Sequence, residues 1–258
     1  MNRHGCAILG MGYLGRPLAE KLFESGREVA AVKRNITSDD VNLPIRLDAV
    51  DLNQSGQFQT ACLNHWADKP VWICLLPPSA VADYLSVLTE WITAAKQCGV
   101  AHIVYGSSIG VYGGEARICD ERSPLNPQTA SSQKVAAAEQ LFLNSGMANI
   151  DILRLGGLYS AERHPLNSLL KRQQNGGAHQ PVNVLHQGRA VAALYQAVNG
   201  PNGIRIRNIV EAQHPPKHEF YRAEALKLGL PEADFDMADV RGGKVVQTAF
   251  DDFLNVLA

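Results

Sequence analysis

The sequence predicts an α/β protein, a doubly wound parallel sheet with a small lobe from the C-terminal part of the chain. Short apolar runs rich in valine and isoleucine alternate with helical patterns, which is typical of a parallel sheet covered on both faces. A glycine-rich turn joins the first apolar run to the first helical pattern. The length of 258 residues fits one large domain or two unequal lobes.

Each expected element has its own local signal. Leu14, Leu18 and Leu22 recur at spacing four and predict a first helix that stops at Ser25-Gly26. Ser79 is expected to cap a long helix that ends at Gly99. Further helices are expected at 131–143, 189–198 and 220–228. The predicted strands are 6–9, 29–32, 45–47, 71–76, 102–105, 150–155 and 205–210.

The alternating pattern loosens in the second half of the chain, which predicts two unequal parts. Residues 1–158 and 182–211 are expected to form a large domain, and residues 159–181 and 212–258 a small substrate-side lobe.

The composition describes a folded protein without a strong charge preference. The formal charge is −1 and hydrophobic residues make up 46% of the chain, which excludes a disordered chain and a broad field for nucleic acid. No apolar run approaches the length of a membrane-spanning helix. The five cysteines form no close pair and have no metal-ligand spacing, so we expect free thiols, no metal site and a cytoplasmic protein.

The glycine turn carries the first functional signal. Gly10, Gly12 and Gly15 follow a strand and open a helix, the context in which a G-x-G-x-x-G turn binds a dinucleotide in a Rossmann-type domain. Tyr13 and Leu14 lie where the helix begins, so their amides are expected to face the phosphates.

The end of the second strand predicts which dinucleotide fits. A carboxylate there would hold the ribose of NAD, but the chain has Lys33 and Arg34, which suit a 2′-phosphate. NADP is therefore expected rather than NAD. Asp51-Leu52 after the third strand is expected near the adenine, although a plain loop position is an equal alternative. The remaining expected cofactor contacts follow the fourth and fifth strands: Leu75, Leu76, Pro77 and Ser107.

Longer motifs in the middle of the chain resemble a known family. Gly-Ser-Ser-Ile-Gly-Val-Tyr-Gly at 106–113 precedes an acidic Pro-Leu-Asn-Pro block at 120–127 and a helix with Ala-Ala-Glu-Gln at 137–140. Together they strongly resemble the extended short-chain dehydrogenase/reductases, the NAD(P)-dependent nucleotide-sugar epimerases and dehydratases. The blocks at 153–159, 185–186 and 228–231 are also similar, so the resemblance covers nearly the whole chain.

The resemblance implies a substrate-binding serine but departs from the family at the proton-transfer pair. Ser108 takes the place of the serine that binds the reacting oxygen. The family's Tyr-x-x-x-Lys pair is replaced. When the chain is aligned with the family pattern without a gap (the ungapped register), Ser131 takes the tyrosine place and Val135 the lysine place. A shift by one residue brings Lys134 to the lysine place but Ala130 to the tyrosine place. The candidate catalytic residues are Ser108, Tyr112, Ser131 and Lys134.

The substrate is expected at the carboxyl ends of the strands. Tyr159, His186 and His214 should border this space, and Lys171 with Arg172 are expected to hold a diphosphate if the substrate has one.

Three functions remain open from the sequence. The first is an NADP-dependent oxidoreductase or epimerase/dehydratase-like enzyme for a small hydroxylated or carbonyl substrate, such as a nucleotide sugar, working without the usual Tyr/Lys relay. The second is a non-catalytic NADP-binding protein that senses redox state or binds a partner. The third, a hydroxy-acid dehydrogenase, matches residues 10–19 but gives the 107–113 block no role. A small-molecule substrate and a homodimer are expected, without nucleic acid or membrane.

Overall fold

A parallel sheet of seven strands forms the centre of the protein in the computed structural model, which describes residues 5–40, 42–54 and 65–257. The strand order is β10-β7-β5-β4-β1-β2-β3, and every pairing is parallel. The order reverses between β1 and β4, the position where ligands bind in open α/β sheets. The strands are β1 (Cys6–Leu9), β2 (Val29–Lys33), β3 (Arg46–Ala49), β4 (Val71–Cys74), β5 (His102–Ser108), β7 (Ile150–Leu155) and β10 (Ile204–Ile209).

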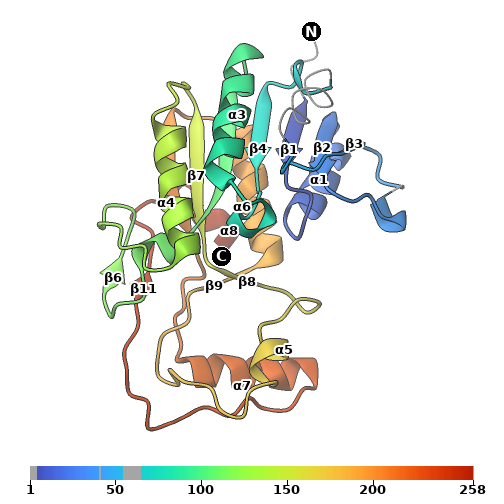
Figure 1. Ribbon diagram of the computed structural model, residues 1–258. Coiled ribbons are helices and arrows are strands. Elements are labelled where there is room, and N and C mark those ends of the chain that lie inside the picture. Colours follow the sequence, from blue (N-terminus) through green and yellow to red (C-terminus); the bar gives the residue numbers. More distant parts are fainter. Residues whose placement is uncertain (1–4, 41, 55–64, 258) are drawn as a thin grey trace.

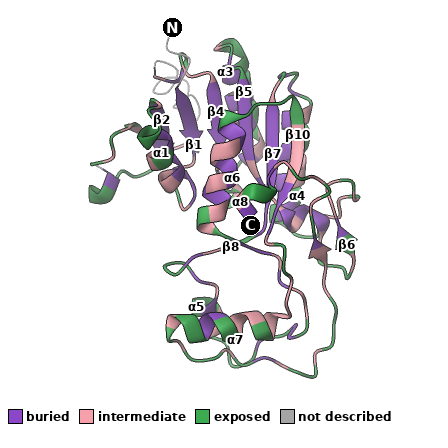
Figure 2. Ribbon diagram, turned by 180° about the vertical axis from the view of Figure 1, so that it is seen from behind, coloured by how far each residue is buried: buried purple, intermediate pink, exposed green. Residues whose placement is uncertain are grey.

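Helices cover both faces of this sheet because its central strands are apolar on both sides (Figures 1 and 2). In β1, Ala7 and Leu9 pack into one core cluster and Cys6 and Ile8 into the other, as the two-residue period of a strand requires. The first face carries α3 (Tyr84–Gln97) and α4 (Ala130–Leu143), and the second carries α1 (Gly15–Glu24), α6 (Gln187–Asn199) and α8 (Leu254–Leu257).

A small lobe lies beyond the carboxyl ends of the strands (Figure 1). It holds α5 (Leu166–Leu169) and α7 (Lys217–Leu228), and its aromatic rings pack on one another, with Tyr221 stacked on Phe235. Two short parallel pairs join it to the large domain. They are β8 (Gly157–Tyr159) with β9 (Val184–His186), and β6 (Ile118–Cys119) with β11 (Val245–Val246).

The predicted fold class is confirmed, but the cap of the long helix and the course of the last residues differ from the expectation. Ser79 does not cap the long helix, because Asp83 does so by accepting a hydrogen bond from the Ser86 amide at 3.0 Å. The last residues do not stay in the small lobe, since Phe253 and Leu257 are buried in the core of the large domain.

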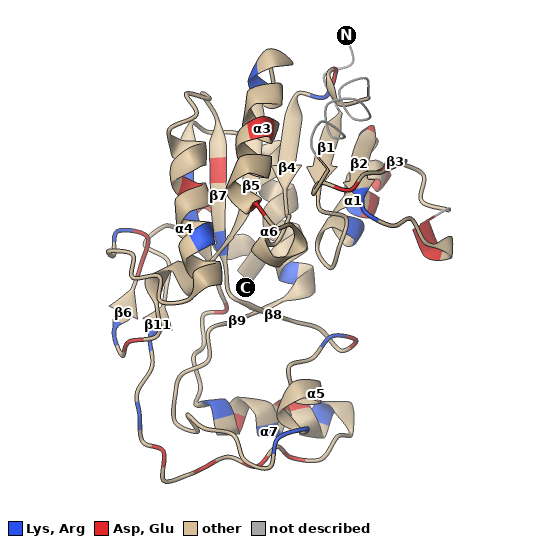
Figure 3. Ribbon diagram, in the orientation of Figure 1, with Lys and Arg blue, Asp and Glu red and all other residues tan. Residues whose placement is uncertain are grey.

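Charged residues of both signs are spread over the two lobes (Figure 3). Among the described helices, none is long and apolar enough to span a membrane. Cys6, Cys74 and Cys119 are buried free thiols and Cys98 is half-buried, whereas Cys62 lies outside the described residues.

Candidate functional site

The glycine turn leaves open space at the point where a pyrophosphate would approach. Gly10 has a φ of 105°, and a Cβ there would lie 2.7 Å from the Leu75 carbonyl carbon. A Cβ on Gly15 would lie 2.1 Å from the Gly10 carbonyl oxygen. A Cβ on Gly12 would meet no atom within 4 Å. The outer glycines therefore serve chain packing, and Gly12 keeps a path open for a ligand.

The start of α1 adds one anion-binding group to this turn. Leu14 occupies the N-cap position and offers no side-chain cap. The Arg16 amide donates to the Gly12 carbonyl at 3.1 Å and Pro17 has no N–H, so the Gly15 amide is the first helical donor that can face a phosphate. The Tyr13 carbonyl accepts a hydrogen bond from Gln187 Nε2 at 2.7 Å, and the Arg163 guanidinium lies 4.8 Å from the Tyr13 ring centre. Both contacts tie later segments of the chain to the turn.

A cavity of about 480 Å³ continues from the turn to the end of β2. Its lining includes Leu52, Leu76 and Pro77, which fits the expected adenosine position. Asp51 lies beside it and accepts two hydrogen bonds from Asn53, which lower the pKa of its carboxyl group. The residues of this cavity fit the adenosine half of a dinucleotide.

The two cations at the end of β2 have different surroundings. Lys33 Nζ lies 2.5 Å from Oδ2 of Asp40, the last residue of the 3₁₀ turn Ser38–Asp40. Asp40 is only 4% exposed. Arg34 lines the cavity and donates a hydrogen bond to the Ala80 carbonyl. Its side chain is 52% exposed, and its Nε lies 3.9 Å from Oδ1 of the half-buried Asp51. Lys33 is therefore held by a buried carboxylate, and Arg34 is the cation better placed to meet a 2′-phosphate.

The hydrogen bonds of Asp40 predict how the free energy of unfolding changes at acid pH. Its hydrogen bond from Lys33, and next the one from the Thr37 amide, hold its pKa well below the usual range. A depressed native pKa stabilises the fold above the unfolded-state value and loses this effect as pH falls through the native value. We therefore expect Asp40→Asn to lower the free energy of unfolding at pH 7 and to reduce the loss of stability below about pH 4. Urea denaturation at a series of pH values measures both, and an unchanged acid slope would contradict the assignment.

Ser107 and Tyr112 belong to a buried network. They line neither the cavity at the glycine turn nor the cavity beside Ser108. Ser107 Oγ donates to Glu139 Oε1 at 2.5 Å, and Arg154 binds both Glu139 carboxylate oxygens, at 2.9 and 2.7 Å. The Tyr112 hydroxyl donates to Asn208 Oδ1 and accepts from Arg154. Burial raises the pKa of Tyr112, and Arg154 offsets only part of this. These contacts argue against the expected cofactor role of Ser107 and the catalytic role of Tyr112.

Ser108 stands at the end of β5, where the expected substrate-binding serine should be. Its Oγ accepts a hydrogen bond from the Gly110 amide at 3.0 Å, and the residue lines a second cavity, of about 420 Å³. On α4, Ser131 is exposed and Lys134 half-buried, and neither lines this cavity. Val135 is 6% exposed and packs in the cluster of Ile109 and Tyr112. Val135, which the ungapped register puts at the family's lysine place, thus has its side chain in the core.

The second cavity brings together polar groups that the sequence motifs did not identify. Lys217 and Tyr221 come from α7, and Lys244 comes from the segment before β11. Their positions in the sequence gave no signal, because α7 has no strong amphipathic pattern and the segment around Lys244 contains no recognised motif. The rest of its lining is Ser108, Ile109, Gly110, Gly114, Gly156, Gly157, Gln180, Pro181, Val182, Asn183, Val184 and Gly243.

The other five expected substrate residues lie outside this lining. The Tyr159 ring packs edge-on against the ring of His186, whose Nδ1 accepts from the Gly188 amide. His214 Nδ1 pairs with the Val182 carbonyl at 2.9 Å. Lys171 and Arg172 are exposed beyond α5 and do not reach the cavity lining. The geometry supports structural roles for the two histidines, and a substrate role for these five residues stays a prediction.

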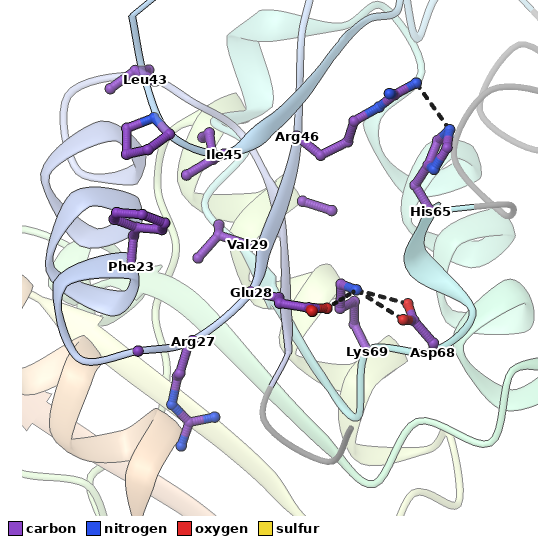
Figure 4. Close-up of a pocket in the computed structure, with 13 residues that line it drawn as sticks. Phe23, Arg27, Glu28, Val29, Leu43, Ile45, Arg46, His65, Asp68 and Lys69 are labelled. Carbon is purple, nitrogen blue, oxygen red and sulfur yellow. Dashed lines mark hydrogen bonds and ion pairs between the residues drawn. The ribbon is translucent and has the colours of Figure 1, made fainter. Parts of the chain in front are cut away.

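A further cavity, of about 650 Å³, lies at the opposite edge of the sheet (Figure 4). It is lined by residues that precede or begin β2, β3 and β4. Lys69 there binds Glu28 and Asp68, and Arg46 pairs with His65. Because ligands of open α/β sheets bind at the carboxyl ends of the strands, the two cavities next to the glycine turn and Ser108 define the candidate site.

Comparisons with known proteins agree with this fold. The model of the NAD dependent epimerase/dehydratase family matches residues 6–194. The protein YeeZ of Escherichia coli (strain K12) is 30% identical over 250 residues, which cover 93% of this chain and 90% of YeeZ. The chain therefore belongs to the NAD dependent epimerase/dehydratase family.

Two solved structures show the same fold. The Bordetella bronchiseptica enzyme WbmH in complex with NAD+ has a TM-score of 0.79 at 18% identity, and the match covers 100% of this chain and 97% of WbmH. The UDP-glucuronic acid 4-epimerase of Bacillus cereus in complex with NAD has a TM-score of 0.76 at 15% identity, and the match covers 98% and 96%. At these identities the likeness concerns the fold alone.

Proposed function

We propose that the protein is an NADP-dependent oxidoreductase of the epimerase/dehydratase type, which acts on a small hydroxylated or carbonyl substrate without the family's Tyr/Lys relay. A nucleotide sugar is the first substrate class to test, because the Bacillus cereus neighbour acts on one. The observation that carries the proposal is the alignment of two cavities along the carboxyl edge of the sheet, one at the glycine turn and one at Ser108.

The residues of the chain have separable tasks in this proposal. The bound dinucleotide supplies hydride transfer. Gly12 and the start of α1 bind its phosphates, and Arg34 binds the 2′-phosphate. Ser108 Oγ, fixed by the Gly110 amide, donates a hydrogen bond to the reacting oxygen of the substrate. The second cavity favours an enzyme over a cofactor sensor, since a sensor needs no space next to Ser108.

The cofactor preference is tested at Arg34. Loss of one charge-assisted contact weakens binding by about 1.5–3 kcal/mol, or roughly tenfold to a hundredfold. We therefore expect Arg34→Ala to weaken NADPH binding by that factor and to leave NADH binding almost unchanged. Fluorescence titration of both cofactors measures this, with exposed Arg222→Ala as the matched control. Equal binding of NADH and NADPH by the unaltered protein would refute the NADP assignment.

The role of Ser108 is tested by turnover. We expect slow conversion of UDP-sugars, because the α4 candidates for the family's proton-transfer pair, Ser131 and Lys134, do not line the cavity near Ser108. Ser108→Ala should lower kcat/KM by about 100-fold, while NADPH binding stays intact. Ser86→Ala, on the exposed face of α3, is the control. Product analysis by NMR is the measurement, and full activity of Ser108→Ala would exclude the proposed role.

A further inference from the structure

Two half-buried lysines from different segments of the chain line the cavity beside Ser108. Lys244 Nζ donates a hydrogen bond to the carbonyl oxygen of Ile109, the residue after Ser108, at 2.6 Å. Lys217, the first residue of α7, donates through Nζ to Gln180 Oε1, also at 2.6 Å. Both partners are neutral oxygens, so neither hydrogen bond compensates the charge of an ammonium group.

No carboxylate compensates these charges within the part of the chain that the structure describes. None of the residues lining the cavity is acidic, and neither lysine forms an ion pair there. Asp239 is the acid whose field reaches Lys217, but its own oxygens bind Arg241 and the Gly177 amide. Burial lowers the pKa of both lysines, as expected for cations with too few partners.

The backbone around the two lysines is fixed by side chains from one segment. Gln180 accepts from Lys217 Nζ and donates through Nε2 to the Gly242 carbonyl at 3.2 Å, so it links both lysine-bearing segments. Asn183 donates to the Lys244 carbonyl at 2.8 Å and accepts from the Val246 amide at 2.7 Å. The cations are therefore held in place before any ligand binds, which lowers the ordering cost of binding.

We propose that Lys217 and Lys244 together bind one anionic group of the substrate, a carboxylate or a phosphoryl group, beside Ser108. That this anion belongs to a substrate rests on the proposed function. The anion site itself depends only on the two lysines. An anion in the cavity supplies the negative charge that both ammonium groups lack, and it accepts charge-assisted hydrogen bonds from both. It places the charged end of the substrate next to the reacting oxygen.

The experiment measures how fast each lysine is acylated by trace acetic anhydride, with peptide mass spectrometry as the readout. The protein is labelled in phosphate, in acetate and in chloride at equal ionic strength and pH, with and without NADPH. An ammonium whose pKa rises by one unit reacts about tenfold more slowly, so we expect that slowing at Lys217 and Lys244 in phosphate or acetate. Exposed Lys96 on α3 is the control and should label equally in all three salts.

Variants and nucleotides identify the source of the anion. Lys217→Met and Lys244→Met should each abolish the protection of the other lysine. Protection by UDP as well as UDP-glucose assigns the site to a diphosphate, protection by UDP-glucuronic acid alone assigns it to a sugar carboxylate, and protection by phosphate alone assigns it to a smaller phosphorylated substrate. Unchanged labelling in every anion, protection of only one lysine, or equal protection of Lys96 would overturn the proposal. Failure of NADPH to bind would overturn the proposed function instead, because the labelling without NADPH still reports on the lysines.

Discussion

Arg154→Met should lower the free energy of unfolding by about 3–5 kcal/mol, the usual cost of leaving one charge of a buried pair without its partner. Arg154 and Glu139 are 3% and 0% exposed, and Arg154 forms a two-point contact with the carboxylate. The same guanidinium donates to the Tyr112 hydroxyl. Removing it leaves a buried acid in the layer that supports the Ser108 loop. Urea denaturation followed by circular dichroism provides the measurement.

The double variant Glu139→Met with Arg154→Met distinguishes a charge effect from lost packing. It removes both charges, so we expect it to be more stable than Arg154→Met alone. A surface control is Glu20→Gln, which removes an exposed ion pair with Arg16 and should change stability by less than about 1 kcal/mol. A loss below about 1 kcal/mol for Arg154→Met would show that the pair contributes little.

Gly10→Ala and Gly12→Ala should separate folding from cofactor binding. Gly10 has a positive φ, and its Cβ would collide with the backbone of Leu75, so we expect Gly10→Ala to lose at least about 1–3 kcal/mol of stability. A Cβ on Gly12 meets no protein atom, so Gly12→Ala should fold with a free energy of unfolding within about 0.5 kcal/mol of the parent.

Gly12→Ala, the variant expected to keep its stability, should be the one that loses cofactor binding. In Gly12→Ala the methyl group takes the space of the pyrophosphate, so NADPH binding should weaken by about tenfold or more although the fold is intact. Isothermal titration calorimetry and thermal unfolding of both variants give the two quantities. Normal NADPH affinity in Gly12→Ala would show that the dinucleotide does not cross the turn at this residue.

The sheet was predictable because its signals are local. The strands at 6–9 and 71–76 are short apolar runs, and the structure has β1 and β4 within these ranges. The third strand was less accurate, expected at 45–47 and found as Arg46–Ala49, because its residues are exposed or half-buried and carry no clear apolar pattern. The short pairs β8–β9 and β6–β11 were not predicted, since two or three residues give no periodicity.

The site was predictable only where it follows the sheet. Gly12 and Ser108 come directly after strands, and a parallel sheet brings those positions to one edge. Tyr112 was a plausible proton donor in the sequence, and its burial against Arg154 depends on a residue far along the chain. Lys217 and Lys244 were missed for the same reason, because their meeting depends on how the small lobe folds back.

The pairing of β11 with β6 bears on the order in which the molecule is assembled. Val245 lies opposite Ile118 in this short ladder, and Lys244 lies one residue before it. During synthesis, the strands β1 to β5 and their helices emerge early and can pack as a unit. The wall of the cavity that carries Lys244 emerges much later, and contacts so distant in sequence form slowly. A nascent chain therefore has its glycine turn well before the cavity beside Ser108 is complete. Under the proposed function, the dinucleotide can then bind during synthesis, before any substrate.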